Sequence, residues 1–148
     1  MKTLIRHSRR QDLPVLLAID QACFPAGIAY TAEEFQHFMT RRGSVSLVAE
    51  IDDEIAGFLV MEMDGPGAAT LITLDVREAC RRLGLASRLL AVSERILKRR
   101  KVPAYVLQVN TENVAAIRLY EKDGFTKARR LPRYYNDGSD AYMMAKVL

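Results

Sequence analysis

Two stretches of the chain repeat apolar residues every three or four positions, which is the spacing of an amphipathic helix. Residues 84–98 place leucine, valine and isoleucine on one side and charged residues on the other. Residues 113–122 form the second stretch, and Gly124, which suits a left-handed helix cap, follows it. We therefore predict two helices in the second half of the chain.

Two more helices are predicted near the N-terminus from their starting signals. Asp12 is a suitable N-cap for a helix that runs to about Ala22, with Pro14 in the first turn, where a missing N–H costs little. Thr31 and Glu34, three residues apart in TAEEF, form a capping box at the start of the other helix.

The remaining apolar runs are short and predict strands. Leu4 and Ile5 open the first, and SLVAEIDDEIAGFLVMEM contains two strands joined by the acidic turn 52–54. ATLITLDV and AYVLQV are two more. The last two strands, residues 125–135 and 141–147, flank a hairpin signal at 136–138.

The resulting order of elements is β-α-α-β-β-β-α-β-α-β-β. It predicts an α/β (α+β) fold with a central mixed β-sheet flanked by helices on both faces. The strand at 70–76, the helix after it and the strand at 104–109 should form one right-handed crossover between parallel strands.

Composition narrows the class of protein. With 148 residues, 49% apolar and 27% charged, we expect one domain spanning residues 1–148. No apolar run approaches the roughly 18–20 residues that cross a bilayer, and no apolar leader is present, so we expect a soluble cytoplasmic protein without a membrane partner. Cys23 and Cys80 lack metal or redox spacing, which predicts two buried thiols and no metal site.

The stretch CRRLGLASRLL, between a predicted strand and the strongest amphipathic helix, is the main candidate for chemistry. A tight turn at a helix start points backbone N–H groups and the positive helix end at one place, which favours an anion. Gly84 and Ala86 leave room for phosphate oxygens, and Arg81 and Arg82 add charge. Close packing of helix on strand would need the same small residues. The stretch matches neither the P-loop nor the three-glycine dinucleotide motif.

The net charge of +4 is spread over several separate basic clusters rather than one tail or one helix face. We therefore do not expect nucleic acid to be the main partner. A small ligand rich in phosphate accounts for some of the same charge equally well.

Two motifs, in this order, resemble those of the GNAT acyltransferase superfamily. The first, [RQ]xxGx[GA], falls on Arg81, Gly84 and Ala86. The second, NxxAxxLYxxxGF, matches Asn113, Ala116, Leu119, Tyr120, Gly124 and Phe125. The resemblance covers essentially the whole chain and implies the acyl-CoA N-acyltransferase fold.

Within that superfamily the chain looks most like the protein N-terminal acetyltransferases, especially the bacterial RimI type, which acetylates the N-terminal alanine of a ribosomal protein. The segments CFP, RRLGLA and RYYNDGSDAYMM carry this likeness. It implies a peptide groove between residues 25–30 and the last hairpin, with a protein N-terminus, such as that of a ribosomal protein, as partner. The substrate contacts would be Tyr30, Gln108, Tyr134 and Tyr135. Cross-strand packing of the last two tyrosines is the alternative.

The resemblance also implies acetyl-CoA as co-substrate, with direct attack of an amine on its thioester. The backbone of Leu74 and Val76 would bind the pantetheine and acetyl groups, and Asn113 would bind the pantetheine arm or act as a cap alone. Tyr120 would protonate the departing thiolate, or would simply pack on its helix. The pyrophosphate would contact Arg81, Arg82, Leu83, Gly84, Leu85, Ala86 and Ser87.

One departure from the RimI pattern concerns the base. Those enzymes carry a glutamate where this chain has Gln108, which cannot accept a proton. Glu62, acting through water, and Glu33 and Glu34 are candidates, or no base is needed. Without a base the reaction favours an α-amine, whose pKa is about 7.7–8.0, over a lysine amine near 10.4. A lysine side chain, a small amine (polyamine, amino acid or aminoglycoside) and a non-catalytic acyl-CoA-binding module stay as alternatives.

Overall fold

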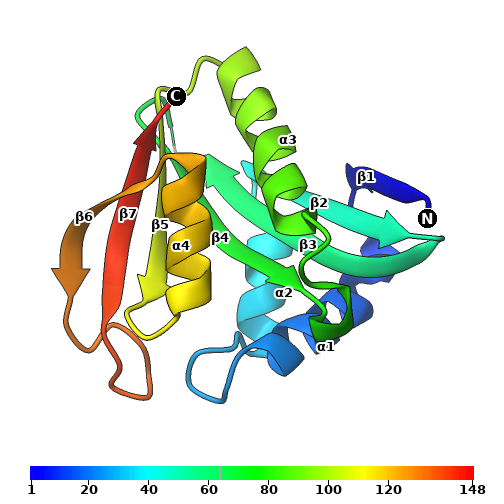
Figure 1. Ribbon diagram of the computed structural model, residues 1–148, viewed down its shortest axis with the longest axis horizontal. Helices are drawn as coiled ribbons and strands as arrows, with labels where there is room; N and C mark the ends of the chain where they lie inside the picture. Colours follow the sequence, from blue (N-terminus) through cyan, green and yellow to red (C-terminus); the bar gives the residue numbers. More distant parts are fainter. Residues whose placement is uncertain (64) are drawn as a thin grey trace.

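A computed structural model describes residues 1–63 and 65–148. Within these residues the chain forms seven strands and four α-helices in the predicted order (Figure 1). The strands are β1 (Thr3–His7), β2 (Ser44–Ile51), β3 (Glu54–Met63), β4 (Ala69–Val76), β5 (Ala104–Asn110), β6 (Thr126–Leu131) and β7 (Ala141–Val147). The helices are α1 (Leu13–Cys23), α2 (Ala32–Thr40), α3 (Leu85–Arg99) and α4 (Val114–Asp123).

The strands form one mixed sheet in the spatial order β1-β2-β3-β4-β5-β7-β6. β1 to β4 pair antiparallel in sequence, and β5, β7 and β6 form a second antiparallel group. β4 and β5 join the two groups and run parallel, as a crossover through α3 requires. Their pairing covers only residues 69–71 against 105–107, which leaves the rest of the β4 edge open to other groups.

Helices cover both faces of the sheet, α1 and α2 on one and α3 and α4 on the other (Figure 1). In β3, Leu59 and Met61 pack in the cluster with α3 and α4, whereas Phe58 and Val60 pack in the cluster with α1 and α2. Because both faces are covered, β3 is buried along most of its length instead of alternating between buried and exposed. The predicted fold class is confirmed.

Two of the predicted helix ends are confirmed. Thr31 Oγ1 accepts the N–H of Glu34, and the Glu34 carboxylate accepts the N–H of Thr31, both at 3.1 Å. Gly124 ends α4 in the left-handed region, at φ 106°. Among the described residues, none of the helices has the length and apolar character needed to cross a bilayer.

The predicted side-chain cap at Asp12 is wrong. Asp12 does occupy the N-cap position of α1, but its carboxylate makes no capping bond to that helix. It lies 2.8 Å from the Arg6 guanidinium and accepts the N–H of Arg9 at 2.7 Å. A charged partner makes a stronger hydrogen bond than a helix N–H, so the carboxylate bonds to the Arg6 guanidinium instead of capping the helix.

The last hairpin also differs from the prediction. β6 ends at Leu131 rather than at Tyr135, and residues 132–140 form a loop. Pro132 cannot donate to a ladder, Arg133 adopts a φ of 49°, and Asp140 accepts the Arg133 N–H at 2.9 Å. Tyr135 and the tyrosine before it are therefore placed on a loop rather than in the sheet.

Candidate active site

β4 and β5 part beyond Leu71 and Leu107 (Figure 1). Two clefts meet there. We call one the turn cleft, because the turn before α3 and the start of that helix border it, through residues 81–82 and 84–87; its volume is about 520 Å³. We call the other the tyrosine cleft, because Tyr30, Tyr134 and Tyr135 line it; its volume is about 410 Å³. The residues common to both are Cys23, Phe24, Leu74, Asn113, Ala116 and Tyr120.

One wall of the turn cleft is a tight backbone turn. Arg82 and Gly84 both have positive φ, 67° and 78°, which bends the chain tightly into α3. A Cβ added to Gly84 would meet no atom within 4 Å, so the glycine serves the left-handed turn and the open approach rather than close packing. Leu85, Ala86 and Ser87 line the cleft in the first helical turn, where N–H groups lack helical partners. This geometry suits an anion.

Arg81 braces the turn against the end of β4. Its Nε donates to the Val76 carbonyl at 3.2 Å, and its guanidinium lies 3.8 Å from Cys23 Sγ. The Cys23 thiol donates to the same carbonyl at 3.5 Å. The Val76 carbonyl is thus occupied, which sequence reasoning did not foresee. Leu74 lines both clefts and Arg82 lines the turn cleft.

Leu83 and the two cysteines do not lie as the sequence predicts. The Leu83 side chain is 46% exposed, and Leu83 is not among the residues that line either cleft, although its neighbours on both sides are. Cys23 and Cys80 are half-buried rather than buried, and both line the turn cleft. The expectation of two buried thiols is therefore wrong, because the open edge of β4 leaves both side chains partly accessible.

α4 supplies two side chains at the junction of the clefts. Asn113 caps the helix, because its Oδ1 accepts the Ala116 N–H at 3.2 Å, and its side-chain NH₂ remains a donor. Tyr120 is 8% exposed, and its ring packs against Phe125 at 5.8 Å between centroids. Burial raises the pKa of Tyr120, and the nearby Asp75 raises it further, so the phenol stays protonated at neutral pH.

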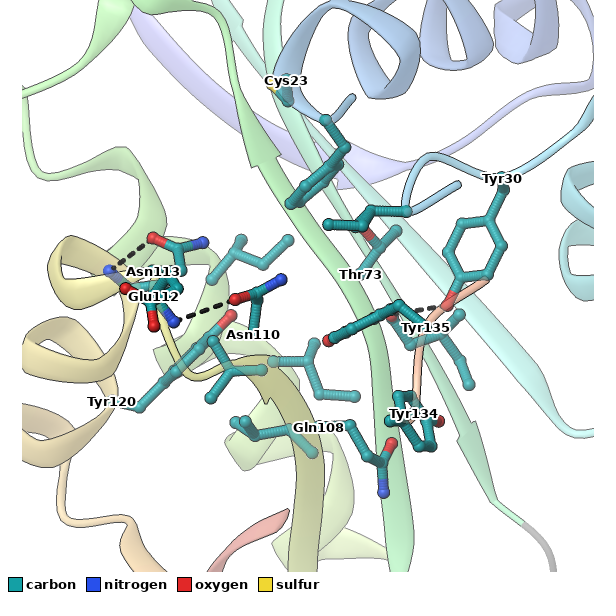
Figure 2. A pocket seen from close by; sticks show the side chains of 18 of the residues that line it. Cys23, Tyr30, Thr73, Gln108, Asn110, Glu112, Asn113, Tyr120, Tyr134 and Tyr135 are labelled. Carbon is teal, nitrogen blue, oxygen red and sulfur yellow. Dashed lines mark hydrogen bonds between the residues drawn. The ribbon is translucent and has the colours of Figure 1, made fainter. Parts of the chain in front are cut away.

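The tyrosine cleft is built from side chains on separate segments (Figure 2). Tyr30, Tyr134 and Tyr135 lie on one side of the cavity, and Asn113 and Tyr120 lie across from them. The Tyr30 hydroxyl donates to the Ile72 carbonyl at 3.3 Å. The rings of the other two tyrosines contact each other edge to face, with centroids 5.0 Å apart. Gln108 of β5 lines the same cavity.

A hydrogen bond joins the two loops that wall this cleft. The Asn136 N–H donates to the Gly27 carbonyl at 3.2 Å, which ties the loop at 132–140 to the loop after α1. Gly27 has a φ of 91°, and a Cβ there would lie 3.1 Å from Asp137 Cβ. Only a glycine fits this left-handed close approach without strain.

The acidic candidates from the sequence lie outside both clefts. Glu62 of β3 is 3% exposed, and its Oε1 lies 2.9 Å from the Arg41 guanidinium. Glu34 serves the capping box of α2, and Glu33 is exposed in the same turn. Among the described residues, neither lining set includes any of the three, so the structure does not bring them to the junction.

A buried acidic group at the junction was missed. Asp20 of α1 is 0% exposed and Asp75 of β4 is 1% exposed. The Thr73 hydroxyl lies 3.5 Å from Asp20 Oδ1 and hydrogen-bonds Asp75 Oδ1. The available signal was an aspartate inside each of two apolar stretches, LLAIDQA and LITLDV, where a core residue is expected. Glu112, an exposed residue that lines the tyrosine cleft, was missed too.

Comparison with known proteins agrees with this fold and identifies its family. The profile of the acetyltransferase (GNAT) family matches residues 13–125. An N-alpha-acetyltransferase of Sulfurisphaera tokodaii is 30% identical, over 97% of this chain and 92% of its own. The crystal structure of the ribosomal-protein-S18-alanine N-acetyltransferase from Escherichia coli is 28% identical, with a TM-score of 0.88, over 99% of this chain and 94% of that one.

NAA60 of Arabidopsis thaliana, solved in complex with acetyl-CoA, is 26% identical, with a TM-score of 0.87, over 99% of both chains. The family profile extends from α1 to Phe125 and so includes the turn cleft and all of α4. These matches confirm the resemblance that the two motifs carry, and the chain belongs to the GNAT acetyltransferase family.

Proposed function

We propose that the protein transfers the acetyl group of acetyl-CoA to the N-terminal α-amine of a protein or peptide. The observation that carries this proposal is the meeting of two clefts where β4 and β5 part, one suited to an anion and the other walled by tyrosines. A thioester held at the junction is open to attack from the opposite cleft. The names of the S. tokodaii relative and the E. coli neighbour support the acceptor, and the NAA60 complex supports the cofactor.

The turn cleft is the proposed place of the cofactor. The pyrophosphate lies against the N–H groups of residues 83–87 and the Arg82 side chain, because a helix N-terminus and a guanidinium both favour phosphate. Arg81 holds the turn in position through the Val76 carbonyl. The pantetheine arm follows the open edge of β4 past Leu74 and receives a hydrogen bond from the free NH₂ of Asn113.

The tyrosine cleft is the proposed place of the acceptor. The joined loops form one wall of this cavity, which is large enough for the first residues of a chain end. Tyr134 and Tyr135 contact the peptide backbone, and Tyr30 and Gln108 contact the first residue. The half-exposed ring of Tyr134 agrees with a role in contact rather than in the core.

The chemistry is direct transfer. The neutral amine attacks the thioester carbonyl carbon, a C–N bond forms, and the C–S bond breaks. Tyr120, kept protonated by its burial and placed at the junction, donates its proton to the departing sulfur. The nitrogen, which carries an extra proton after the attack, gives it up to restore the phenol, so that a neutral amide and a thiol are formed.

We further propose that a ribosomal protein is among the substrates and that the protein works in the cytoplasm as one domain over residues 1–148. The E. coli neighbour, by its name, acts on an alanine of ribosomal protein S18. Cys23 and Cys80 are free thiols, as is usual in a reducing compartment. Both hydrophobic clusters pack on the two faces of a single sheet, which supports one domain.

The test uses acetyl-CoA with matched peptides. Peptides that begin with Ala or Met should react far faster than the same peptides blocked at the N-terminus and carrying an internal lysine. At pH 7.5 roughly a quarter to 40% of an α-amine is neutral, against about 0.1% of a lysine amine. Equal or faster reaction of the blocked peptides, or reaction of polyamines or aminoglycosides alone, would overturn the N-terminal assignment. Acetyl-CoA binding without turnover on any amine would identify a non-catalytic module.

A further inference from the structure

We propose that Asp20, Thr73 and Asp75 form the proton acceptor of this reaction, and that a proton reaches the two carboxyl groups from the substrate ammonium through the Thr73 hydroxyl. The inference rests on the proposed function, because it requires an amine in the tyrosine cleft. The three residues would supply the base that Gln108, whose side chain cannot accept a proton, does not provide.

The placement of the three residues supports this role. Thr73 lines the tyrosine cleft, Asp75 lines the turn cleft, and both belong to the open end of β4. Asp20 reaches them from α1, with its Oδ1 3.5 Å from the Thr73 hydroxyl. The group therefore forms part of the wall between the two clefts, beside the junction where the thioester and the amine meet.

The two carboxyl groups have unequal hydrogen bonding. Asp20 Oδ2 accepts the N–H of Tyr30 at 2.9 Å, a bond that stabilises a charge on Asp20. Asp75 Oδ2 is buried, and no donor among the described residues reaches it. An unsatisfied carboxylate oxygen in a buried site costs free energy, so this atom is a place for a proton.

Two carboxyl groups in contact in a buried site do not both ionise at neutral pH, because their charges repel and neither is well solvated. Burial is the main cause that raises the pKa of Asp75 well above its ordinary value, and the hydrogen bond and charge interaction with Asp20 raise it further. The pair then carries one proton and one negative charge, and it can accept one more proton.

Other titratable groups face the pair from four neighbouring segments. They are Cys23 of α1, Tyr30 of the loop after α1, Arg81 of the turn before α3, and Tyr120 of α4. Among these groups Arg81 is the one that carries a charge at neutral pH, and it favours the ionised form of Asp75. The guanidinium therefore helps to keep the pair singly protonated, and ready to act as a base, near neutral pH.

The proton balance of the reaction is complete with these residues. The substrate ammonium gives one proton to the Thr73 oxygen while Thr73 passes its own proton to the carboxyl pair. The neutral nitrogen then attacks, and Tyr120 gives its proton to the sulfur as the C–S bond breaks. The nitrogen's second proton restores the Tyr120 phenol, and the proton held by the pair returns to solvent.

The pH dependence of kcat separates this mechanism from one without a base. Without a base, kcat follows the neutral fraction of the α-amine and rises about 20-fold between pH 6.5 and 9 for a pKa near 7.8. When the carboxyl pair acts as the base, the bound ammonium loses its proton inside the cleft. The plateau of kcat is then reached at a pH below the α-amine pKa. We expect wild type to change by no more than about twofold over that range.

The experiment measures kcat from pH 5.5 to 9.5 with saturating acetyl-CoA and a peptide that begins with Ala. Asp75→Asn should lower kcat about 10²-fold at pH 6.5 and restore the roughly 20-fold rise toward pH 9. Thr73→Val should do the same, whereas Thr73→Ser, which keeps the hydroxyl, should keep the wild-type profile. Infrared spectra of the free protein at pH 7 should show a protonated carboxyl band that Asp75→Asn removes.

Calorimetric affinity for acetyl-CoA and thermal unfolding identify any variant that fails to fold. The proposal is overturned by a wild-type profile that itself rises 20-fold, by variants that lose activity equally at every pH, or by absence of the infrared band. If a small amine reacts and peptides do not, the proposed function fails, and the same pH comparison on that amine still decides the role of the pair. If no amine reacts, both fail.

Discussion

The turn cleft and the tyrosine cleft share a wall but are built in different ways. One wall of the turn cleft comes from a single stretch, residues 81–87 without Leu83, in which left-handed backbone at Arg82 and Gly84 sets the shape. The rest of that cleft is lined from α1, β4 and α4. The tyrosine cleft has no such local wall and is assembled from α1, the loop after it, β4, β5, α4 and the loop at 132–140. Local chain geometry fixes the turn, whereas packing between distant segments fixes the tyrosine cleft.

The difference predicts different responses to mutation. A site made of backbone depends on a few φ angles and on the charge placed near them, so a single substitution at the turn removes it. A site made of side chains on several segments loses affinity one contact at a time. Each change below tests that contrast at one cleft, with the other cleft as its internal reference.

The largest effect is expected for Gly84→Asp. The new side chain enters the space open to phosphate, adds a negative charge there, and occupies a backbone φ of 78°. Affinity for acetyl-CoA should fall by about 10³-fold or more, which is about 4 kcal/mol in calorimetry. Gly84→Asn is the matched control, because it has the same size and tolerates a left-handed backbone without the charge. Equal affinities for wild type and Gly84→Asp would move the cofactor away from this turn.

The next effect concerns Tyr120, one of the residues that line both clefts. Tyr120→Phe should lower kcat by about 10²-fold or more and leave acetyl-CoA affinity nearly unchanged, because only the proton donor is lost. Tyr105→Phe is the control: this buried tyrosine donates to Ser93 at 3.0 Å, away from either cleft, and its loss should leave kcat unchanged. A Tyr120→Phe enzyme with normal kcat would remove the acid role.

A smaller effect is expected at the tyrosine cleft. Tyr134→Ala should raise KM for an Ala-initiated peptide by about 10-fold, without a change in acetyl-CoA affinity, because one contact of several is lost. Tyr134→Phe keeps the ring and should stay within about twofold of wild type. An unchanged KM in Tyr134→Ala would place the peptide elsewhere.

The smallest effect is expected from the cap of α2. Thr31→Ala removes one half of the capping box beside Tyr30 and should lower the free energy of unfolding by about 1 kcal/mol in urea denaturation. Thr31→Ser keeps the cap and should be close to wild type. Peptide KM should rise in the alanine variant, while acetyl-CoA affinity, set at the other cleft, stays the same.

The sequence predicts more of the turn cleft than of the tyrosine cleft for the same physical reason. Gly84 and the helix after it are adjacent in the chain, so their relation follows from local patterns. The order of strands and helices along the chain also follows from local patterns. Asp20 and Asp75 come together only through the packing of α1 on β4, and no local pattern announces that contact.

Two of the differences between prediction and structure have a similar origin. Asp12 has the right type and position for a cap, but Arg6, on the strand before it, competes for its carboxylate. The strand before the last is predicted to run to Tyr135, next to the hairpin signal at 136–138, although Pro132 already stands against ladder pairing. In both cases one specific group, the Arg6 guanidinium or the ring of Pro132, outweighs a general propensity.

The separate outer walls of the two clefts have a kinetic consequence. Leu74 and Tyr120 border both cavities, but the turn before α3 borders one of them and the loops at 25–30 and 132–140 border the other. If coenzyme and peptide occupy the two cavities as proposed, each has its own opening to solvent. The proposal therefore predicts that product inhibition by coenzyme A and by acetylated peptide can be altered separately, by substitutions at one opening or the other.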